Sequence, residues 1–241
     1  MKITIFTIFP EIITQFFDVG LLAKARNNGI WELKVVNIRD YSENNYKQVD
    51  DIAYGGGQGM VMKPDILSKA IDDNCDVENT TFFYMSPRGR VLNQQVIKEY
   101  KQLDNIAIIC GRYEGIDQRA IDEYKMIEIS IGDYVLMGGE LPAMVFIEGL
   151  VRCLPGVVGN EQSIVEDSFG GAMGTDYDDL LEYPLYTIPR TWRNRIVPDV
   201  LLSGNHGKIV GWKLDEAKKI TKKRRPDIWR KYLEKKLNTK E

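Results

Sequence analysis

The stretch that decides the fold is Ser130-Ile131-Gly132-Asp133-Tyr134-Val135-Leu136-Met137-Gly138-Gly139-Glu140-Leu141-Pro142. It follows an apolar run, residues 126–131, that predicts a buried strand, and it leads into residues 142–153, which predict a helix. Pro142 suits the first turn of that helix, where a missing N–H costs nothing. The glycines between strand and helix let a backbone approach a ligand closely. This order of strand, glycine-bearing loop and helix is typical of a ligand-binding α/β protein.

Two further glycine-bearing loops each follow a predicted strand. Met85-Ser86-Pro87-Arg88-Gly89-Arg90 follows residues 81–85, and Gly111-Arg112-Tyr113-Glu114-Gly115-Ile116-Asp117 follows residues 106–110. In open parallel sheets, ligands bind outside the carboxyl ends of the strands. Ordinary turn chemistry could explain any one of these loops, whereas three of them at successive strand ends favour a ligand pocket.

The first 150 residues alternate short apolar runs with amphipathic stretches. The apolar runs predict strands at residues 2–9, 31–37, 81–85, 106–110 and 126–131. The amphipathic stretches predict helices at residues 11–27, 64–73, 93–102, 116–123 and 142–153. Strands that are apolar on both faces are buried on both faces, so the pattern predicts an α/β domain with a mostly parallel sheet.

The last third of the chain has a different composition. Residues 159–190 are rich in glycine and polar residues, which is typical of a flexible linker. Beyond them, residues 215–220 and 226–237 predict helices with Lys and Arg on their polar faces. We therefore expect three parts: an α/β domain at 1–158, a flexible interdomain linker at 159–189, and a small basic helical domain at 190–241.

The charge is divided unevenly along the chain. Residues 1–189 carry 16 basic and 29 acidic side chains, a balance of −13, whereas residues 190–241 carry 16 basic and 6 acidic side chains, a balance of +10. A basic segment attached to an acidic domain favours a nucleic-acid-binding role for that segment, because Lys and Arg neutralise phosphates. A solvated helical face would give the same pattern, and charge alone does not separate these two interpretations.

Length and composition exclude several classes of protein. A chain of 241 residues with 44% hydrophobic residues can bury a core without disulfides or a structural metal. Three cysteines without a CxxC pair argue against a disulfide framework or zinc site and favour a reducing compartment. The N-terminus lacks the layout of a signal peptide, and no apolar run approaches about 18 residues. We expect a cytoplasmic protein with no membrane contact.

The single histidine removes much of the enzymatic repertoire. A histidine-rich metal site is impossible, and a Ser-His-Asp or Cys-His arrangement would have to use His206. The chain has no G-x-x-x-x-G-K-[ST] phosphate loop, and Tyr54-Gly55-Gly56-Gly57-Gln58-Gly59-Met60 does not fit G-x-G-x-x-G. A P-loop NTPase and a nicotinamide oxidoreductase are therefore disfavoured.

Taken together, these motifs resemble one known family. The three loops, the 54–60 turn, Glu166-Asp167-Ser168-Phe169 and Leu201-Leu202-Ser203-Gly204-Asn205-His206 look like the bacterial tRNA (guanine-N1)-methyltransferase family, TrmD. The likeness covers essentially the whole chain. It implies a SPOUT methyltransferase fold, which is an α/β domain with a mostly parallel sheet and a deep trefoil knot, followed by a small basic helical domain. It also implies a homodimer with its active site at the subunit interface. Pattern reasoning would not have proposed a knot.

The resemblance implies a site for S-adenosylmethionine in the knot loops. Apolar Ile131, Leu136 and Pro142 would sandwich the adenine ring, and backbone groups of the loops would read its edge. Glu114 would interact with the ribose or with the positive charges of the methyl donor, and the sequence leaves both roles open. The full set of expected cofactor-binding residues is Tyr84, Met85, Ser86, Pro87, Gly111, Tyr113, Glu114, Gly115, Ser130, Ile131, Gly132, Tyr134, Leu136, Gly138, Gly139 and Pro142.

The resemblance also assigns catalytic roles. Asp167 would be the general base that removes the proton from guanine N1, and Ser163 would assist it. The pKa of an ordinary aspartate lies roughly five units below that of the N–H, equivalent to about 7 kcal/mol, so the developing guanine anion must be stabilised. Arg152 matches the arginine that takes this role in the family, and a guanidinium suits it because it stays charged.

The implied substrate is the guanine immediately 3′ of the anticodon, position 37, of tRNA. The basic C-terminal domain would hold the anticodon stem by its phosphates. Magnesium is a possible further requirement, although no ligand cluster in the sequence indicates a metal site. The sequence departs from the usual family pattern at Leu185 and Ile188, where a His and an Arg are expected, which puts linker contacts to tRNA in doubt. The alternatives are a SPOUT-type methyltransferase for another RNA and a non-catalytic RNA-binding protein.

Overall fold

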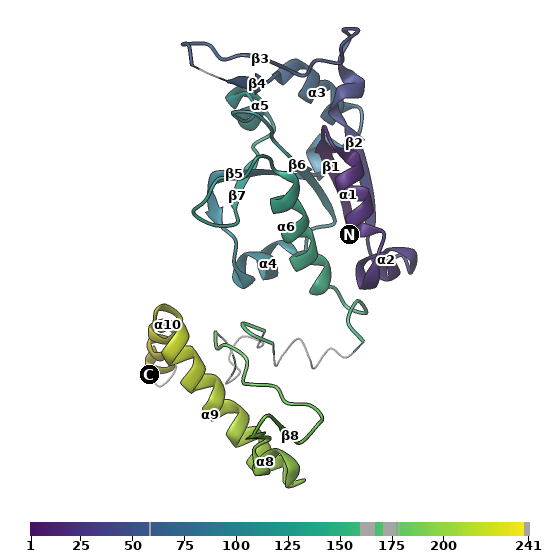
Figure 1. Ribbon diagram of the computed structural model, residues 1–241. Coiled ribbons are helices and arrows are strands. Elements are labelled where there is room, and N and C mark those ends of the chain that lie inside the picture. Colours follow the sequence, from purple (N-terminus) through teal and green to yellow (C-terminus); the bar gives the residue numbers. More distant parts are fainter. Residues whose placement is uncertain (58, 160–166, 171–176, 178, 239–241) are drawn as a thin grey trace. The chain divides into compact units, whose positions relative to one another are not determined.

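The computed structural model describes residues 1–57, 59–159, 167–170, 177 and 179–238. By contacts the chain divides into two compact units, Met1–Gly159 and Asn160–Glu241. Each unit is described by itself below (Figure 1). Within the part of the chain that the structure describes, no helix is long and apolar enough to cross a membrane.

The first unit is built on a five-stranded parallel sheet in the order β2-β1-β6-β5-β7. The strands are β1 (Lys2–Thr7), β2 (Glu32–Asn37), β5 (Thr81–Val91), β6 (Asn105–Ile109) and β7 (Ile127–Ser130). Adjacent side chains on a strand point to opposite faces, and here both faces are apolar. The predicted α/β class and mostly parallel sheet are therefore confirmed.

Helices cover both faces of this sheet (Figure 1). On one face Phe83 of β5 packs in a core with residues of four helices: α1 (Pro10–Phe17), α2 (Gly20–Asn27), α4 (Gln94–Tyr100) and α6 (Glu140–Arg152). On the other face Tyr84 packs in a second core with α3 (Pro64–Asp72) and α5 (Gln118–Glu123). Neighbouring residues of one strand thus serve two cores, which explains why the strands are apolar without alternation.

The helix expected at 11–27 is in fact two helices, α1 and α2. The chain leaves the helical conformation at Asp18 and Val19, and Gly20 takes φ +69°, where a glycine has no steric penalty. The periodicity of apolar residues continues across this break, so sequence pattern alone did not reveal it. Phe17, the last residue of α1, packs edge-to-face on Trp31, with ring centroids 5.4 Å apart.

Strand β5 is longer than the sequence pattern predicted. Both Met85 and Arg90 pair with Ile129 of β7, so residues 86–89 bulge out of the ladder before pairing resumes. A Cβ on Gly89 would overlap the backbone of Glu128, so only glycine lets the strand return this close to β7. The bulge carries one of the three glycine-bearing loops.

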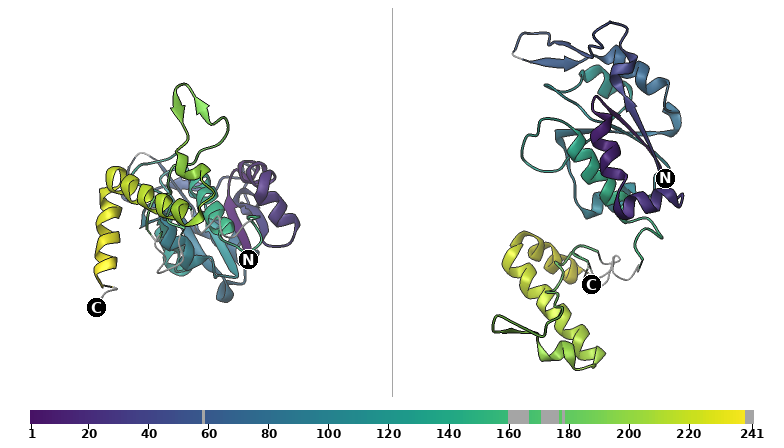
Figure 2. Two further views of the ribbon diagram at one scale, coloured as in Figure 1. Left: turned by 90° about the horizontal axis from the view of Figure 1, so that it is seen from below. Right: turned by 45° about the vertical axis from the view of Figure 1, so that its right-hand side comes forward.

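Several short elements flank the sheet. A hairpin of β3 (Asp50–Ile52) and β4 (Met60–Met62) contains the 54–60 turn and projects from the unit in the views of Figures 1 and 2. Two 3-10 turns, Ile38–Tyr41 and Val77–Asn79, lie in connections between elements. Neither the hairpin strands nor these turns were predicted, because each is too short to show a period.

The second unit contains two long helices, α9 (His206–Arg224) and α10 (Pro226–Asn238), preceded by the short α8 (Asp199–Leu202). Helix α9 begins nine residues before the helix expected at 215–220, where the Asn205 side chain accepts the N–H of Lys208 as an N-cap. The hairpin of β8 (Thr191–Trp192) and β9 (Arg195–Ile196) projects beside these helices (Figure 2).

A matched pair of phenylalanines tests the packing of α1. Phe17 is fully buried and Phe16, its neighbour, is 37% exposed. We expect Phe17→Ala to lower the free energy of unfolding by about 3–5 kcal/mol, since it removes a core ring against Trp31. Phe16→Ala should cost about 1 kcal/mol. Urea unfolding of both variants measures this, and equal losses would contradict the packing.

Candidate active site

The three glycine-bearing loops lie at one edge of the sheet. Strands β6, β5 and β7 are adjacent and parallel, so their carboxyl ends, and the loops after them, meet at the same edge. Together with the first turn of α6, these loops enclose a cavity of about 220 Å³. The topology thus brings together segments that are far apart in the sequence.

All sixteen residues expected to bind a cofactor line this cavity. The lining contains four further residues that the sequence analysis did not include, namely Arg112, Ile129, Val135 and Met137. Three of them, Arg112, Val135 and Met137, lie within the quoted loops, so including every residue of those loops would have found them. Ile129 belongs to β7 itself, and only the fold places it at the cavity.

Tyr84 forms part of the cavity wall through two close glycine contacts. A Cβ on Gly111 would lie 2.9 Å from the Tyr84 ring, and one on Gly115 would lie 2.8 Å from its hydroxyl oxygen. Gly115 also takes φ +119°, which other residues rarely adopt. Burial raises the pKa of the Tyr84 phenol, and a backbone hydrogen bond at Ile116 opposes this rise. The Tyr84 phenol therefore stays protonated and neutral at physiological pH.

The loop after β7 is held by its own polar groups. The Ser130 hydroxyl donates to the carbonyl of Gly132 at 3.1 Å, and the Gly132 N–H lies 3.2 Å from the same hydroxyl oxygen. The Tyr134 hydroxyl donates to the Ile131 carbonyl at 3.3 Å. These contacts stiffen the turn and leave the Tyr134 ring and the Leu136 side chain partly exposed at the cavity.

Glu140 joins three segments around the cavity. Its carboxylate is 2% exposed, accepts a hydrogen bond from the Thr7 hydroxyl at 2.7 Å and pairs with the Arg112 guanidinium at 2.9 Å. The Arg112 guanidinium also stacks over the Phe9 ring, 4.5 Å from its centroid. Next to this pair, the Gly139 N–H donates to the Gly111 carbonyl at 2.9 Å. The contacts fix the loop after β6 against the start of α6.

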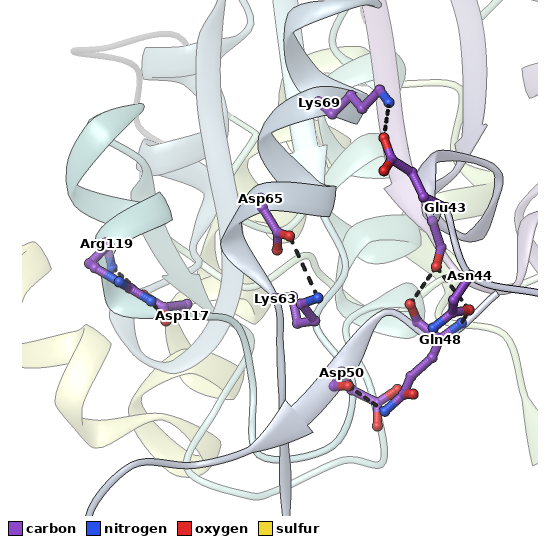
Figure 3. A network of polar contacts seen from close by, with 10 residues as sticks. Glu43, Asn44, Gln48, Asp50, Lys63, Asp65, Lys69, Asp117 and Arg119 are labelled. Atoms are coloured by element: carbon purple, nitrogen blue, oxygen red, sulfur yellow. Dashed lines mark hydrogen bonds and ion pairs between the residues drawn. The ribbon is translucent and has the colours of Figure 1, made fainter. Parts of the chain in front are cut away.

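A larger groove of about 970 Å³ adjoins the cavity and shares Tyr84, Ser86, Pro87 and Glu114 with it. Its lining includes three cations and four carboxylates. Figure 3 shows how they pair: Arg119 forms a two-armed contact with Asp117, and Lys63 lies 3.5 Å from Asp65. The Arg119 contact lowers the pKa of Asp117. The third cation, Arg88, pairs with Glu128 at 3.1 Å, so each cation of this groove has a carboxylate partner.

The expected catalytic residues lie in different units. Arg152 is the last residue of α6 and is exposed. Asp167 belongs to the second unit, where the Gly170 N–H donates to its carbonyl oxygen at 2.8 Å. Ser163 lies outside the described residues, as does part of the linker expected at 159–189. Arg152 and Asp167 therefore belong to two units that are each described by themselves.

Potential metal ligands do not cluster in the described part of the chain. No group of three or more His, Cys, Asp or Glu side chains that could hold a metal ion occurs there. His206 is exposed at the first position of α9, in the second unit. Cys110 lies under Gly139, and burial raises the pKa of its thiol well above the usual range, so it is an inert core residue.

A glycine-lined cavity at the carboxyl ends of adjacent parallel strands is the arrangement in which open α/β proteins bind small ligands. Comparison with known proteins specifies the class. The family described as tRNA (Guanine-1)-methyltransferase TrmD matches residues 1–231, and the chain belongs to that family.

Curated relatives agree along almost the whole chain. A tRNA (guanine-N(1)-)-methyltransferase of Wolbachia pipientis subsp. Culex pipiens is 47% identical over 228 residues, 94% of this chain and 96% of the relative. One of Pelagibacter ubique is 46% identical over 95% of this chain and 96% of the relative. One of Ruegeria sp. is 42% identical over 99% of this chain and 96% of the relative.

Removal of the Glu140 carboxylate should damage the cavity. We expect Glu140→Ala to lower the free energy of unfolding by about 3 kcal/mol, because it leaves Arg112 and the buried Thr7 hydroxyl without their acceptor. The matched control is Glu99→Ala, which breaks an exposed Arg–Glu pair of nearly equal length, 2.8 Å. That change should cost less than about 1 kcal/mol. Urea unfolding separates the two, and a similar small loss in both would refute a structural role for Glu140.

Proposed function

We propose that this protein transfers the methyl group of S-adenosylmethionine to N1 of the guanine at position 37, immediately 3′ of the anticodon, in tRNA. Membership of the TrmD family makes it a methyltransferase, and its relatives are tRNA (guanine-N(1)-)-methyltransferases. The observation that carries the proposal is the cavity, in which all sixteen residues expected for the methyl donor lie together. Action on tRNA implies a cytoplasmic protein.

The lining of the cavity supports a bent, partly apolar nucleoside as its ligand. Close glycines at 111, 115 and 139 leave open backbone where a Cβ would meet Tyr84 or the backbone of Cys110. Ile131, Leu136 and Pro142 offer apolar surfaces to an adenine ring, and Glu114 offers a carboxylate. S-adenosylmethionine supplies a methyl group that is already activated. The trefoil knot of the family is part of the proposal, and the three loops that would form it surround this cavity.

The chain's own residues would supply proton removal and charge stabilisation. Guanine N1 becomes a good nucleophile once Asp167 takes its proton. The Arg152 guanidinium would balance the negative charge that then develops on the guanine O6, and Ser163 would support Asp167. Alignment and proton removal suffice for the transfer, since no covalent intermediate with the enzyme is needed. The proposal assigns no protein ligands to magnesium.

An exposed apolar face supports a homodimer. Leu141 and Val145 of α6 are 57% and 50% exposed, and at helical spacing they share one face with Glu148 and Arg152. Met137, just before this helix, is 91% exposed. A second copy covering the face would bury this surface and place Arg152 at the interface. We propose that Asp167 of one subunit then acts over the cofactor cavity of the other.

The second unit would hold the tRNA. Helix α9 ends in a run of cations, Lys218, Lys219, Lys222, Lys223 and Arg224. Arg193 and Arg195 stand exposed on the β8–β9 hairpin, and the Arg193 guanidinium lies 4.8 Å from the centroid of the Trp192 ring. Such groups bind phosphates and stack on bases without reading sequence, so they would position the anticodon stem. Arg190 or Arg193 would take the place of the arginine that the family pattern has where this chain has Ile188.

Methyl transfer to defined transcripts tests the activity. Labelled S-adenosylmethionine should label a tRNA transcript with guanine at position 37 but not one with adenine there, with and without magnesium in parallel. Asp167→Ala should lower the rate by about 100-fold or more, the usual contribution of a general base. The control Asp73→Ala alters an exposed aspartate at the end of α3 and should leave the rate unchanged.

The outcomes separate the alternatives. Label on ribosomal RNA but not on tRNA would indicate a SPOUT-type enzyme for another RNA. Salt-sensitive tRNA binding without methyl transfer would indicate a non-catalytic RNA-binding protein. Equal rates for Asp167→Ala and wild type would keep the enzyme and remove Asp167 as its base.

Mixed dimers test whether subunits share a site. Glu114→Ala should impair the cofactor cavity, and Asp167→Ala should remove the base. If Asp167 acts over the partner's cavity, a mixed dimer of these two variants retains one intact site. An equimolar mixture refolded together should then recover about a quarter of wild-type activity. Each variant alone should stay near background, and the absence of recovery in the mixture would argue for sites within single subunits.

A further inference from the structure

Thr221 is a fully buried polar residue inside the basic helix α9. Its hydroxyl donates to the Ala217 carbonyl at 2.7 Å, the usual local bond of a helical threonine. The same hydroxyl oxygen accepts the backbone N–H of Leu181 at 2.9 Å. Thr221 therefore connects α9 to a segment 40 residues earlier, and two exposed lysines, Lys222 and Lys223, follow it in the helix.

That earlier segment is packed firmly on the helices. Leu180 is 1% exposed and shares a small core with Tyr183, Ala217 and Tyr232. The Lys213 ammonium lies 4.6 Å from the centroid of the Tyr183 ring. The segment around residues 180–183 is therefore part of the packed body of the second unit.

Two hydrogen bonds continue from this segment to the turn that carries Asp167. The Phe169 N–H donates to the Leu180 carbonyl, and the Glu182 N–H donates to the Ser168 hydroxyl oxygen, both at 2.9 Å. Phe169 takes φ +62°, a conformation that a non-glycine residue keeps only when its surroundings impose it. The turn at 167–170 is thus held by residues 180–182, which are held in turn by Thr221.

We infer that Thr221 is a positioning residue for the methyl transfer, because it ties the Asp167 turn to the helix that would bind tRNA. The inference rests on the proposed function. A general base works only within hydrogen-bond reach of its proton, and a misplacement of about 1 Å can cost about 100-fold in rate. Phosphates bound to α9 would contact the same helix that fixes the turn, so binding and chemistry would be coupled through one side chain.

The test compares variants that differ only at the hydroxyl. Thr221→Val keeps the branched shape but cannot accept the Leu181 N–H, whereas Thr221→Ser keeps the hydroxyl. The control is Thr14→Val, since the Thr14 hydroxyl of α1 makes the same local bond, to the Pro10 carbonyl at 2.9 Å. All are made in the full-length chain, and thermal unfolding checks that each variant folds.

Single-turnover methyl transfer and tRNA affinity are measured for each variant. Thr221→Val should slow transfer about tenfold, the effect of leaving one buried donor unpaired, with a tRNA Kd within about twofold of wild type. Thr221→Ser should restore the rate to within about threefold of wild type, and Thr14→Val should not change it. A rate for Thr221→Val equal to that of Thr221→Ser, or a loss only in tRNA affinity, would overturn the inference.

Amide hydrogen exchange separates this inference from the proposed function. Thr221→Val should speed exchange at Leu181 and also at Phe169, whose N–H bonds to the neighbouring Leu180. If the wild-type protein fails to methylate tRNA, the proposed function fails, and exchange at Phe169 still decides whether Thr221 holds the turn. Faster exchange at Leu181 with no change at Phe169 would overturn the connection.

Discussion

The buried carboxylate of Glu140 is the constraint on which the rest of the site depends. A carboxylate that is 2% exposed must be balanced, and the chain balances it with Arg112 from the loop after β6 and Thr7 from the end of β1. Glu140 and its two partners come from three segments distant in sequence. Because Glu140 starts α6, its contacts also set where that helix begins. The Glu140 carboxylate thus connects the end of β1, the loop after β6 and the start of α6 beside the cavity.

Glycine lets two backbone segments approach each other closely in the same region. The Gly139 N–H bonds to the Gly111 carbonyl, and a Cβ on Gly139 would lie 2.8 Å from the Cα of Cys110. Backbone therefore packs on backbone where most proteins place side chains. Polar backbone groups are left at the cavity edge, where they can read a ligand, while apolar residues such as Leu136 cover its faces. The packing of backbone on backbone thus both fixes the loops and leaves the binding surface open.

The two units divide the proposed work. The first carries the cavity and Arg152, and the second carries Asp167 and the basic helices. In such an enzyme, the position of the general base can depend on whether tRNA is bound, because the base and the tRNA-binding helices belong to the same unit. Thr221 would transmit this dependence, because its hydroxyl accepts a hydrogen bond from the segment that supports the Asp167 turn.

The sequence by itself determined the class of the fold and the edge of the sheet at which a ligand would bind, and the resemblance to a known family supplied sixteen of the residues that line the cavity. Apolar strands and glycine-bearing loops are local features, and Gly111 or Gly132 is visible without any partner. Only the tertiary structure decided the break at Gly20, the return of β5 at Arg90, the role of Glu140 and that of Thr221. Each of these depends on a contact between segments distant in the chain, and local pattern carries no information about which segments meet.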